Sequence, residues 1–567
     1  MGRGIRVFAG WLCLLLGGVA CGQVSVVTQH NDLGRTGHNP NETLLTTSNV
    51  NVVQFGKLFA RTVDGYIYAQ PLYVPSLTLG GRTHNVVFVA TENNSVYAFN
   101  ADDPNASTPL WKVNLGTPVP SSDICTPSVT GCPYLDLIPQ IGITATPVID
   151  TSTGTLYVVA KTKNTSNSTY HFFLHALDLL SGAERFGGPA EITAANFVPL
   201  NHNNRPGLLL VNGTVYAAFG SVGDLRPWHG WIFGFNSSTL QLTVSFNATP
   251  QGSDGGMWGG GVGLAADADN VYAVTGNGTF DANTGGSDYG DSVLKLSTSS
   301  GLSVADYFTP DNQSYLFSVD ADLGSGGPLL LPGTSMLVVA GKDGILRLIN
   351  TSNMGRFNST FNADVQEFQA SSGQVLGGFA YANSPSFGPA VYLWGPGSYL
   401  TAWEFNGSTF QTTPASRGNI SNVGGESPAV PLSISSNQDQ AGTGIVWAVK
   451  PSSDPVHQVV TGTLYAFDAN NLSTELWDSK QNAARDDVGN YAKFNPPTVA
   501  NGKVYLGTFS GQLLVYGLNP PNTSGVTFVQ VNAATPQSST ASVPVAYRSS
   551  QTAGDLNVVV VGWNDAT

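Results

Sequence analysis

The amino-acid sequence predicts an all-β fold, an eight-bladed β-propeller whose ring is closed by a strand from the N-terminal part of the chain. Three observations predict it: a composition suited to strands and turns, a repeated pair of strands, and a surplus strand before the first repeat. Only 11% of the 567 residues are charged, and the chain contains 66 Gly and 33 Pro. Helix surfaces need many Lys and Glu side chains, so this composition favours short strands joined by turns.

A two-strand pattern recurs about eight times, at a spacing of roughly sixty residues. Each copy has an apolar strand, a turn, and a second strand that often ends in an aromatic and a polar residue. NVVFVAT with SVYAFN (85–100) and GIVWAVK with GTLYAFDAN (444–470) are two copies. A short strand rich in Gly and Pro precedes each pair, and another short strand follows most pairs. Four strands per repeat are typical of a propeller blade.

The last repeat lacks its fourth strand, whereas residues 55–63 (FGKLFARTV) form a strand pattern that belongs to no repeat. We therefore expect residues 55–63 to complete the eighth blade and remove an open sheet edge. The propeller is predicted to span residues 24–519. Residues 520–525 are predicted to be a linker, and 526–567 a truncated Ig-like module, a partial β-sandwich with strands at 526–532, 541–547 and 555–563.

The N-terminal residues 1–22 have the pattern of a secretory signal peptide. Arg3 and Arg6 precede an apolar stretch at 7–20 that ends in small residues. We therefore expect a secreted, periplasmic or cell-envelope protein without a transmembrane segment in its mature part; a lipid anchor on Cys21 is an alternative. In an oxidising compartment Cys125 and Cys132 are predicted to form a disulfide.

The net charge of −14 argues against nucleic-acid binding, because an acidic surface repels phosphates. The expected partners are a small molecule, a glycan or an envelope protein.

The ends of the repeats carry a family resemblance. Tyr465-Ala466-Phe467-Asp468 with Leu476-Trp477, and Tyr97-Ala98-Phe99-Asn100 with Leu110-Trp111, resemble the tryptophan-docking motif of the pyrroloquinoline-quinone (PQQ) repeat superfamily. Over residues 24–519 the chain looks like a secreted bacterial PQQ-repeat propeller of the quinoprotein alcohol dehydrogenase-like kind. The resemblance implies a quinoprotein-like fold, with PQQ and Ca²⁺ as cofactors for oxidising sugars or alcohols. The same superfamily includes a propeller lipoprotein of outer-membrane assembly, so the resemblance also allows a role of that kind.

The chain departs from the enzymes that it resembles. Those enzymes hold PQQ over a disulfide between adjacent cysteines, and some carry a C-x-x-C-H haem motif; this sequence has neither. No local motif matches all of the Glu, Asn and Asp ligands of the family's Ca²⁺. The leading hypothesis is therefore a secreted or envelope propeller that binds or scaffolds, with the dehydrogenase and the assembly lipoprotein as alternatives.

The starts of the innermost strands are expected to ring one mouth of the central channel. The candidate ligand-binding residues there are Gln70, Gln140, Thr144, Arg205, Trp258, Glu426 and Lys493. Arg and Lys suit an anion, Trp suits a flat ring, and Glu426 is a candidate catalytic base or calcium ligand. The alternative is that these side chains pair with one another and fill the channel. The Gly-rich run at 255–263 either cradles a ligand or packs tightly at the axis.

A candidate metal site lies in one turn. Asp281, Asn283 and Asp288, with Asp291 after them, place oxygen ligands at a spacing that suits Ca²⁺. A solvated turn closed by Asx hydrogen bonds has the same pattern. His229, between aromatic residues, is interpreted as a structural histidine.

Overall fold

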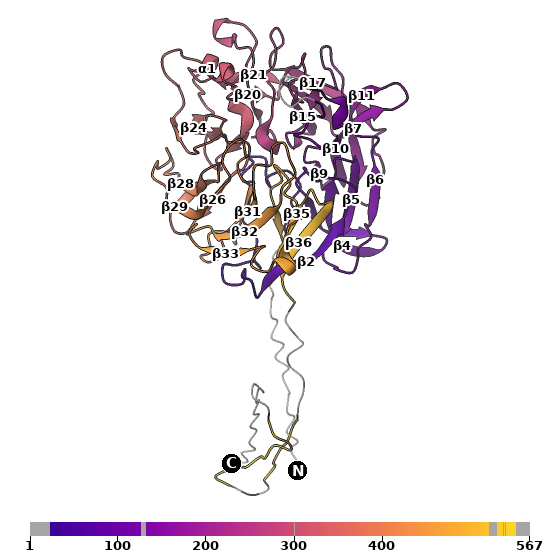
Figure 1. The fold of residues 1–567 in the computed structure, drawn as a ribbon, viewed down its shortest axis with the longest axis vertical. Coiled ribbons are helices and arrows are strands. Elements are labelled where there is room, and N and C mark those ends of the chain that lie inside the picture. Colours follow the sequence, from indigo (N-terminus) through magenta and orange to yellow (C-terminus); the bar gives the residue numbers. More distant parts are fainter. Residues whose placement is uncertain are drawn as a thin grey trace, which may run out of the picture. The chain divides into compact units, whose positions relative to one another are not determined.

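The computed structural model describes residues 23–125, 132–299, 301–520, 530–536, 538 and 540–551. Eight antiparallel sheets, each built on four strands, form an eight-bladed β-propeller (Figure 1). The predicted fold class is confirmed.

The first four blades follow one another along the chain, each from its innermost to its outermost strand. Blade 1 contains β3 (Leu72–Leu79), β4 (Arg82–Ala90), β5 (Ser95–Asn100) and β6 (Trp111–Asn114). Blade 2 contains β9 (Val148–Asp150), β10 (Thr155–Asn164), β11 (Thr169–Asp178) and β12 (Ala190–Glu191). Blade 3 contains β14 (Leu209–Val211), β15 (Thr214–Ser221), β16 (Trp231–Asn236) and β17 (Leu242–Asn247). Blade 4 contains β18 (Ala265–Ala266), β19 (Asn270–Val274), β20 (Val293–Ser297) and β21 (Ser303–Phe308).

The other four blades have the same order of strands. Blade 5 contains β22 (Pro328–Leu330), β23 (Met336–Ala340), β24 (Ile345–Asn350) and β25 (Gln366–Gln369). Blade 6 contains β26 (Phe379–Ser384), β27 (Gly388–Leu393), β28 (Tyr399–Glu404) and β29 (Ser416–Ser421). Blade 7 contains β30 (Leu432–Ser435), β31 (Ile445–Pro451), β32 (Gly462–Asp468) and β33 (Glu475–Asp478). Blade 8 contains β34 (Thr498–Ala500), β35 (Lys503–Gly507), β36 (Gln512–Leu518) and β2 (Phe55–Thr62).

Short elements connect the blades or add to them. They are β1 (His38–Asn39), which pairs with β30; β13 (His202–Asn203), which pairs with β15; the pair β7 (Val119–Pro120) and β8 (Gln140–Ile141); the helices α1 (Gln313–Ser318) and α2 (Ala483–Asp486); and the 3₁₀ turns η1 (Ser121–Asp123), η2 (Gly259–Gly261), η3 (Ala282–Thr284) and η4 (Leu323–Ser325).

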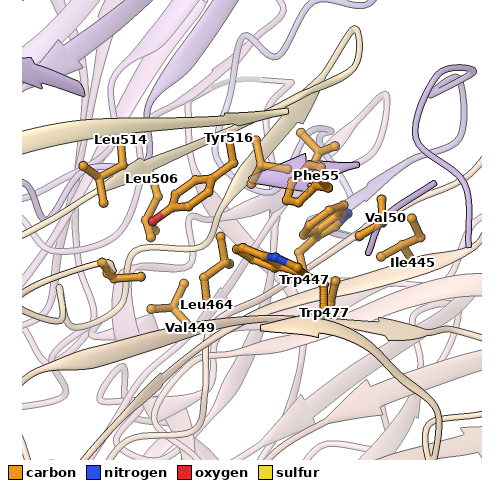
Figure 2. Close-up of a cluster of buried hydrophobic side chains, with 14 of the residues drawn as sticks. Val50, Phe55, Ile445, Trp447, Val449, Leu464, Trp477, Leu506, Leu514 and Tyr516 are labelled. Atoms are coloured by element: carbon orange, nitrogen blue, oxygen red, sulfur yellow. The ribbon is translucent and has the colours of Figure 1, made fainter. Parts of the chain in front are cut away.

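The N-terminal strand β2 closes the ring, as predicted for residues 55–63. It runs antiparallel to β36, with Phe55 opposite Leu518 and Thr62 opposite Gln512 (Figure 1). Phe55 is fully buried, and its ring centroid lies 5.0 Å from that of Trp477 and 5.4 Å from that of Trp447 (Figure 2). Burial of these aromatic rings at the seam between blades 7 and 8 stabilises the closure.

The segment at 26–39 forms hydrogen bonds with all eight blades, which the sequence pattern did not predict. Its backbone bonds to Tyr73, Ile149, Ala266, Leu330, Tyr381 and Ile434 in blades 1, 2, 4, 5, 6 and 7. The Arg35 guanidinium donates to the carbonyl of Leu208, next to β14 of blade 3, and Asn39 donates to the carbonyl of Val499 in blade 8. Because these partners lie on or beside the innermost strands, the segment closes one end of the channel.

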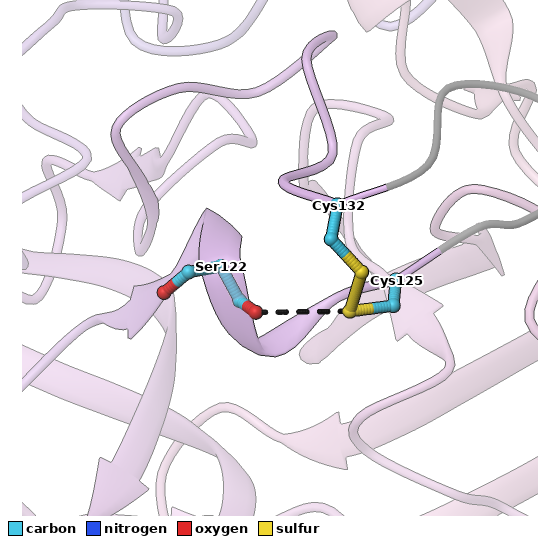
Figure 3. The surroundings of a disulfide bond; sticks show 3 residues. All are labelled: Ser122, Cys125 and Cys132. Carbon is cyan, nitrogen blue, oxygen red and sulfur yellow. Dashed lines mark hydrogen bonds between the residues drawn. A yellow bond between two sulfur atoms is a disulfide. The ribbon is translucent and has the colours of Figure 1, made fainter.

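The predicted disulfide between Cys125 and Cys132 is present, beside η1 (Figure 3). It joins the two ends of the segment 126–131, which lies outside the described residues. The chain that follows Cys132 carries Tyr134 and Asp136 to the central cavity described below.

One compact unit ends at Leu518, and a second comprises residues 519–567. In the second unit the described residues contain no strand, and this includes the predicted strand at 541–547. The predicted strand at 555–563, most of the linker at 520–525, part of 526–532 and the predicted signal peptide at 1–22 lie outside the described residues. Among the described residues, no helix is long and apolar enough to cross a membrane.

Candidate functional site

A cavity of about 710 Å³ lies at the centre of the propeller, and loops of several blades line it. A void of about 10 Å³ shares Gly260, Leu376 and Phe494 with this cavity and also touches Gln29 and His30 of the N-terminal segment. Gly260 has φ 54°, and a Cβ atom on it would lie 2.5 Å from the backbone nitrogen of Gly377. Gly260, Leu376 and Phe494 therefore form the floor of the cavity, and the N-terminal segment lies beneath that floor.

Four of the predicted mouth residues line this cavity: Arg205, Trp258, Glu426 and Lys493. Gln70, Thr144 and Gln140 do not. Gln70 is buried, accepts the backbone N–H of His30 at 2.9 Å and donates to Thr498 Oγ1 at 3.1 Å, so it fastens the N-terminal segment to the blades. Thr144 is also buried. Gln140 donates to Asn93 Oδ1 at 2.9 Å.

Arg205 lies over the faces of two aromatic rings. Its guanidinium carbon lies 5.7 Å from the ring centroid of Trp258 and 5.2 Å from that of Phe494. Within the described part of the chain, this guanidinium forms no ion pair and no hydrogen bond. The cation is oriented by ring faces, which attract it through their quadrupoles but do not neutralise its charge.

Trp258 packs against three glycine residues. A Cβ atom on Gly220, Gly256 or Gly276 would lie 3.1–3.4 Å from the indole, which is closer than most Cβ contacts. Trp228 meets Trp258 edge to face, with ring centroids 6.1 Å apart. Within the Gly-rich run at 255–263, Gly256 packs against this indole, whereas Gly260 lines the cavity.

Asp136 links three other residues that line the cavity. Its carboxylate accepts the Tyr134 hydroxyl at 2.9 Å and contacts Nδ1 of His457, while its backbone carbonyl accepts Lys493 Nζ at 2.7 Å. Burial lowers the pKa of Lys493 to about 8. His457 Nε2 lies 3.9 Å from Glu426 Oε2. Asp136 and His457 were not found from sequence, because they lie 321 positions apart in loops without a local motif.

Several other carboxylates line the cavity. Lys342 Nζ lies 2.6 Å from Asp322 and 3.1 Å from Asp320, and Arg226 lies 2.7 Å from Asp254. Burial raises the pKa values of Asp254 and Asp322. Burial also disfavours the ammonium form of Lys342, but the charges of Asp322 and Asp320 outweigh this effect and raise its pKa.

Asp224 is another of these carboxylates. It accepts the Ser221 hydroxyl at 2.7 Å, and burial raises its pKa.

The cavity lacks the cysteine support that PQQ has in the enzymes that the sequence resembles. The described residues contain no group of three or more His, Cys, Asp or Glu side chains placed to hold a metal ion. The disulfide joins cysteines seven positions apart, and neither cysteine lines the cavity. The adjacent-cysteine disulfide that the family uses to support PQQ is therefore missing from the described part of this chain.

The predicted metal turn uses its carboxylates for hydrogen bonds to the backbone. Asp281 accepts the N–H of Asp288 at 2.8 Å, and Asp288 accepts the N–H of Gln251 at 3.0 Å. Asn283 lies within η3. Asp291 is fully buried and accepts the N–H of Leu323 at 3.2 Å. The Asp281–Asp288 hydrogen bond is of the kind that closes a turn, and the calcium interpretation stays a prediction.

His229 has partners of the kind expected for a structural histidine. Its backbone N–H donates to His202 Nε2 at 3.2 Å, and its Nδ1 lies 3.2 Å from Thr249 Oγ1.

No protein-family model matches the chain, and no curated protein matches it. Among solved structures, the quinohemoprotein alcohol dehydrogenase from Comamonas testosteroni is similar with a TM-score of 0.52 and 13% identity, over 87% of this chain and 80% of that one. A quinohemoprotein alcohol dehydrogenase from Pseudomonas putida gives 0.49 and 14%, over 90% and 82%. BamB from Moraxella catarrhalis gives 0.44 and 13%, over 82% and 99%. At 13% identity, the similarity to the Comamonas enzyme is one of fold alone.

Proposed function

We propose that this chain is a secreted or cell-envelope binding propeller whose central cavity takes a small polar ligand. The observation that carries the proposal is the cavity itself, closed at its floor and about 710 Å³ in volume. Small-molecule sites in proteins commonly measure about 300–1,000 Å³ and combine aromatic walls with a few polar groups. The walls here combine Trp228, Trp258 and Phe494 with charged side chains of both signs.

Polar atoms without partners support a polar ligand. Asp254 Oδ1, Asn277 Oδ1 and the indole nitrogens of Trp228 and Trp258 belong to residues that line the cavity, and none of these atoms has a hydrogen-bond partner in the described part of the chain. A buried polar atom left unpaired costs about 1–3 kcal/mol. A ligand or bound water that reaches these atoms recovers part of that cost.

The proposed compartment rests on the cysteines. The Cys125–Cys132 disulfide is typical of oxidising compartments outside the cytoplasm. The predicted signal peptide at 1–22 points to the same compartment.

A variant that fills the cavity tests the proposal. Gln374 lines the cavity, so Gln374→Trp should occupy it, whereas Gln411→Trp adds the same ring at an exposed position outside the cavity. The probes are glucose, galactose, glucuronate, galacturonate, glutamate, citrate, and PQQ with CaCl₂, each followed by thermal shift and isothermal titration calorimetry. At least one organic probe should bind the wild type and the Gln411→Trp variant but not the Gln374→Trp variant.

Two results contradict the proposal. One is that no probe binds, or that every binding probe still binds after Gln374→Trp. The other is that PQQ with CaCl₂ binds in the cavity and supports reduction of a redox dye, which would establish the dehydrogenase instead.

A further inference from the structure

We infer that the ligand of the central cavity carries a carboxylate group that Arg205 binds, and that the ligand is a polyhydroxylated monocarboxylate of the hexuronate class. This inference rests on the proposed binding function and names the chemistry of its ligand.

The first step concerns the charge of Arg205. The other cationic side chains of the described lining have partners: Arg226 pairs with Asp254, Lys342 with Asp320 and Asp322, and Lys493 donates to two backbone carbonyls. Arg205 alone among them has neither a carboxylate nor a carbonyl partner in the described part of the chain. A partly buried cation without a counter-charge is costly, and an external anion lowers that cost.

The second step concerns the surroundings of Arg205 within the protein. Glu92 is a buried carboxyl near enough to feel the charge of Arg205, but it accepts the N–H of Gly142 at 2.6 Å and forms no ion pair with Arg205. Burial raises the pKa of Glu92 to about 7, so it is a poor counter-charge near neutral pH. Lys493 lies close enough to add positive charge on the same side of the cavity.

The third step concerns geometry. Trp258 and Phe494 contact Arg205 through their ring faces at 5.7 and 5.2 Å, which fixes the orientation of the planar guanidinium without using its N–H groups as donors. A preoriented guanidinium with free N–H groups suits the two oxygens of a carboxylate, which it binds as a fork.

The fourth step concerns the rest of the ligand. Asp224, Asp254, Asp320 and Asp322 line the same cavity. These carboxyl groups repel a dianion such as sulfate more strongly than a monoanion, and they accept hydrogen bonds from hydroxyl groups. In a ligand with one carboxylate on a ring with several hydroxyl groups, the carboxylate binds Arg205 and the hydroxyl groups bind the aspartates.

A charge-removing variant tests the inference. Arg205→Gln keeps hydrogen-bond donors but removes the charge, and Arg205→Lys keeps the charge but removes the fork. Arg417→Gln is the matched control, because Arg417 also lies over an aromatic ring, 3.9 Å from the Tyr399 centroid, but outside the cavity. Circular dichroism of each variant shows whether it is folded. The probes are glucuronate, glucose, inorganic phosphate and inorganic sulfate, titrated calorimetrically.

We expect the wild type and the Arg417→Gln variant to bind glucuronate at least tenfold more tightly than glucose, and more tightly than phosphate or sulfate. Arg205→Gln should weaken glucuronate binding at least tenfold and leave glucose binding unchanged, with Arg205→Lys between the two. Equal binding of glucuronate and glucose, lost in both cases on Gln374→Trp, would overturn the carboxylate inference but leave the binding function standing. Tighter binding of phosphate or sulfate, or an unchanged affinity for glucuronate after Arg205→Gln, would also overturn it. If none of the probes listed under Proposed function binds, the proposed function fails as well.

Discussion

Replacement of Arg35 by methionine should release the N-terminal segment from the floor of the propeller. Arg35 is fully buried and donates to four acceptors: the carbonyls of Leu264 and Gln29 at 2.8 Å each, Thr28 Oγ1 at 2.7 Å and the carbonyl of Leu208 at 3.3 Å. These acceptors belong to the N-terminal segment itself and to the chain next to the inner strands of blades 3 and 4. Methionine keeps the length and apolar packing of the side chain but donates to none of them.

The magnitude follows from the number of acceptors that the substitution leaves unpaired. Each buried acceptor without a donor costs about 1–3 kcal/mol, and the sum over the four acceptors is an upper bound on the loss of stability. The measured loss should be smaller, because water and neighbouring donors move in to bind some of the acceptors. Hydrogen bonds that involve a charged group contribute about 1.5–3 kcal/mol each. Burial lowers the pKa of Arg35 to about 10, so the side chain is still a cation at neutral pH and its hydrogen bonds are charge-assisted.

We therefore expect Arg35→Met to lower the free energy of unfolding by about 3–5 kcal/mol, because its lost charge-assisted hydrogen bonds are only partly replaced. The assay is urea unfolding at pH 7.5 followed by tryptophan fluorescence, with limited proteolysis to show whether residues 26–39 become accessible. The exposed Arg82 on β4 supplies the control, since Arg82→Met should change stability by at most about 0.5 kcal/mol. A loss below about 1 kcal/mol for Arg35→Met, without new cleavage in the segment, would refute the reasoning.

Two further predictions concern buried groups near the axis. Neutral His202 donates from Nδ1 to the Val198 carbonyl and accepts the His229 N–H at Nε2, and burial lowers its pKa from 6.5 to about 4. The folded state thus binds fewer protons than the unfolded state between pH 4 and 6.5, so its stability falls as the pH is lowered through this range. The loss of stability that His202 causes over this range is about 3 kcal/mol. His202→Asn should remove this contribution from the pH dependence of urea unfolding. An unchanged pH dependence would contradict this. Gly260→Ala should cost about 1–3 kcal/mol more than Gly333→Ala in the same assay, because both glycines have positive φ but only Gly260 meets other backbone atoms within 3 Å; equal losses would show that the floor contact is unimportant.

The blade architecture could be predicted from the sequence because it is local. Alternation of apolar and polar residues sets each strand, and turn residues set each hairpin, within a few dozen positions. The strand at 55–63 belonged to no repeat, and the last repeat lacked a strand, so the two could be predicted to pair. The structure has this pairing, between β2 and β36. The disulfide was equally local, since Cys125 and Cys132 are seven positions apart.

The site depended on tertiary structure for a different reason. Arg205, Trp258, Glu426 and Lys493 were predicted from their places before inner strands, and the ring brings all four to one cavity. The same rule failed for Gln70, which the N-terminal segment covers.

By itself, then, the sequence determined the number of blades, the closing strand and the disulfide, because each depends on patterns within or next to a repeat. Only the tertiary structure decided which loops meet at the axis, since closing the ring brings Asp136 to His457 across 321 positions. It likewise decided that Arg205 lies over two rings without an ion-pair partner in the described part of the chain, because Asp254 and Asp322 pair with other cations.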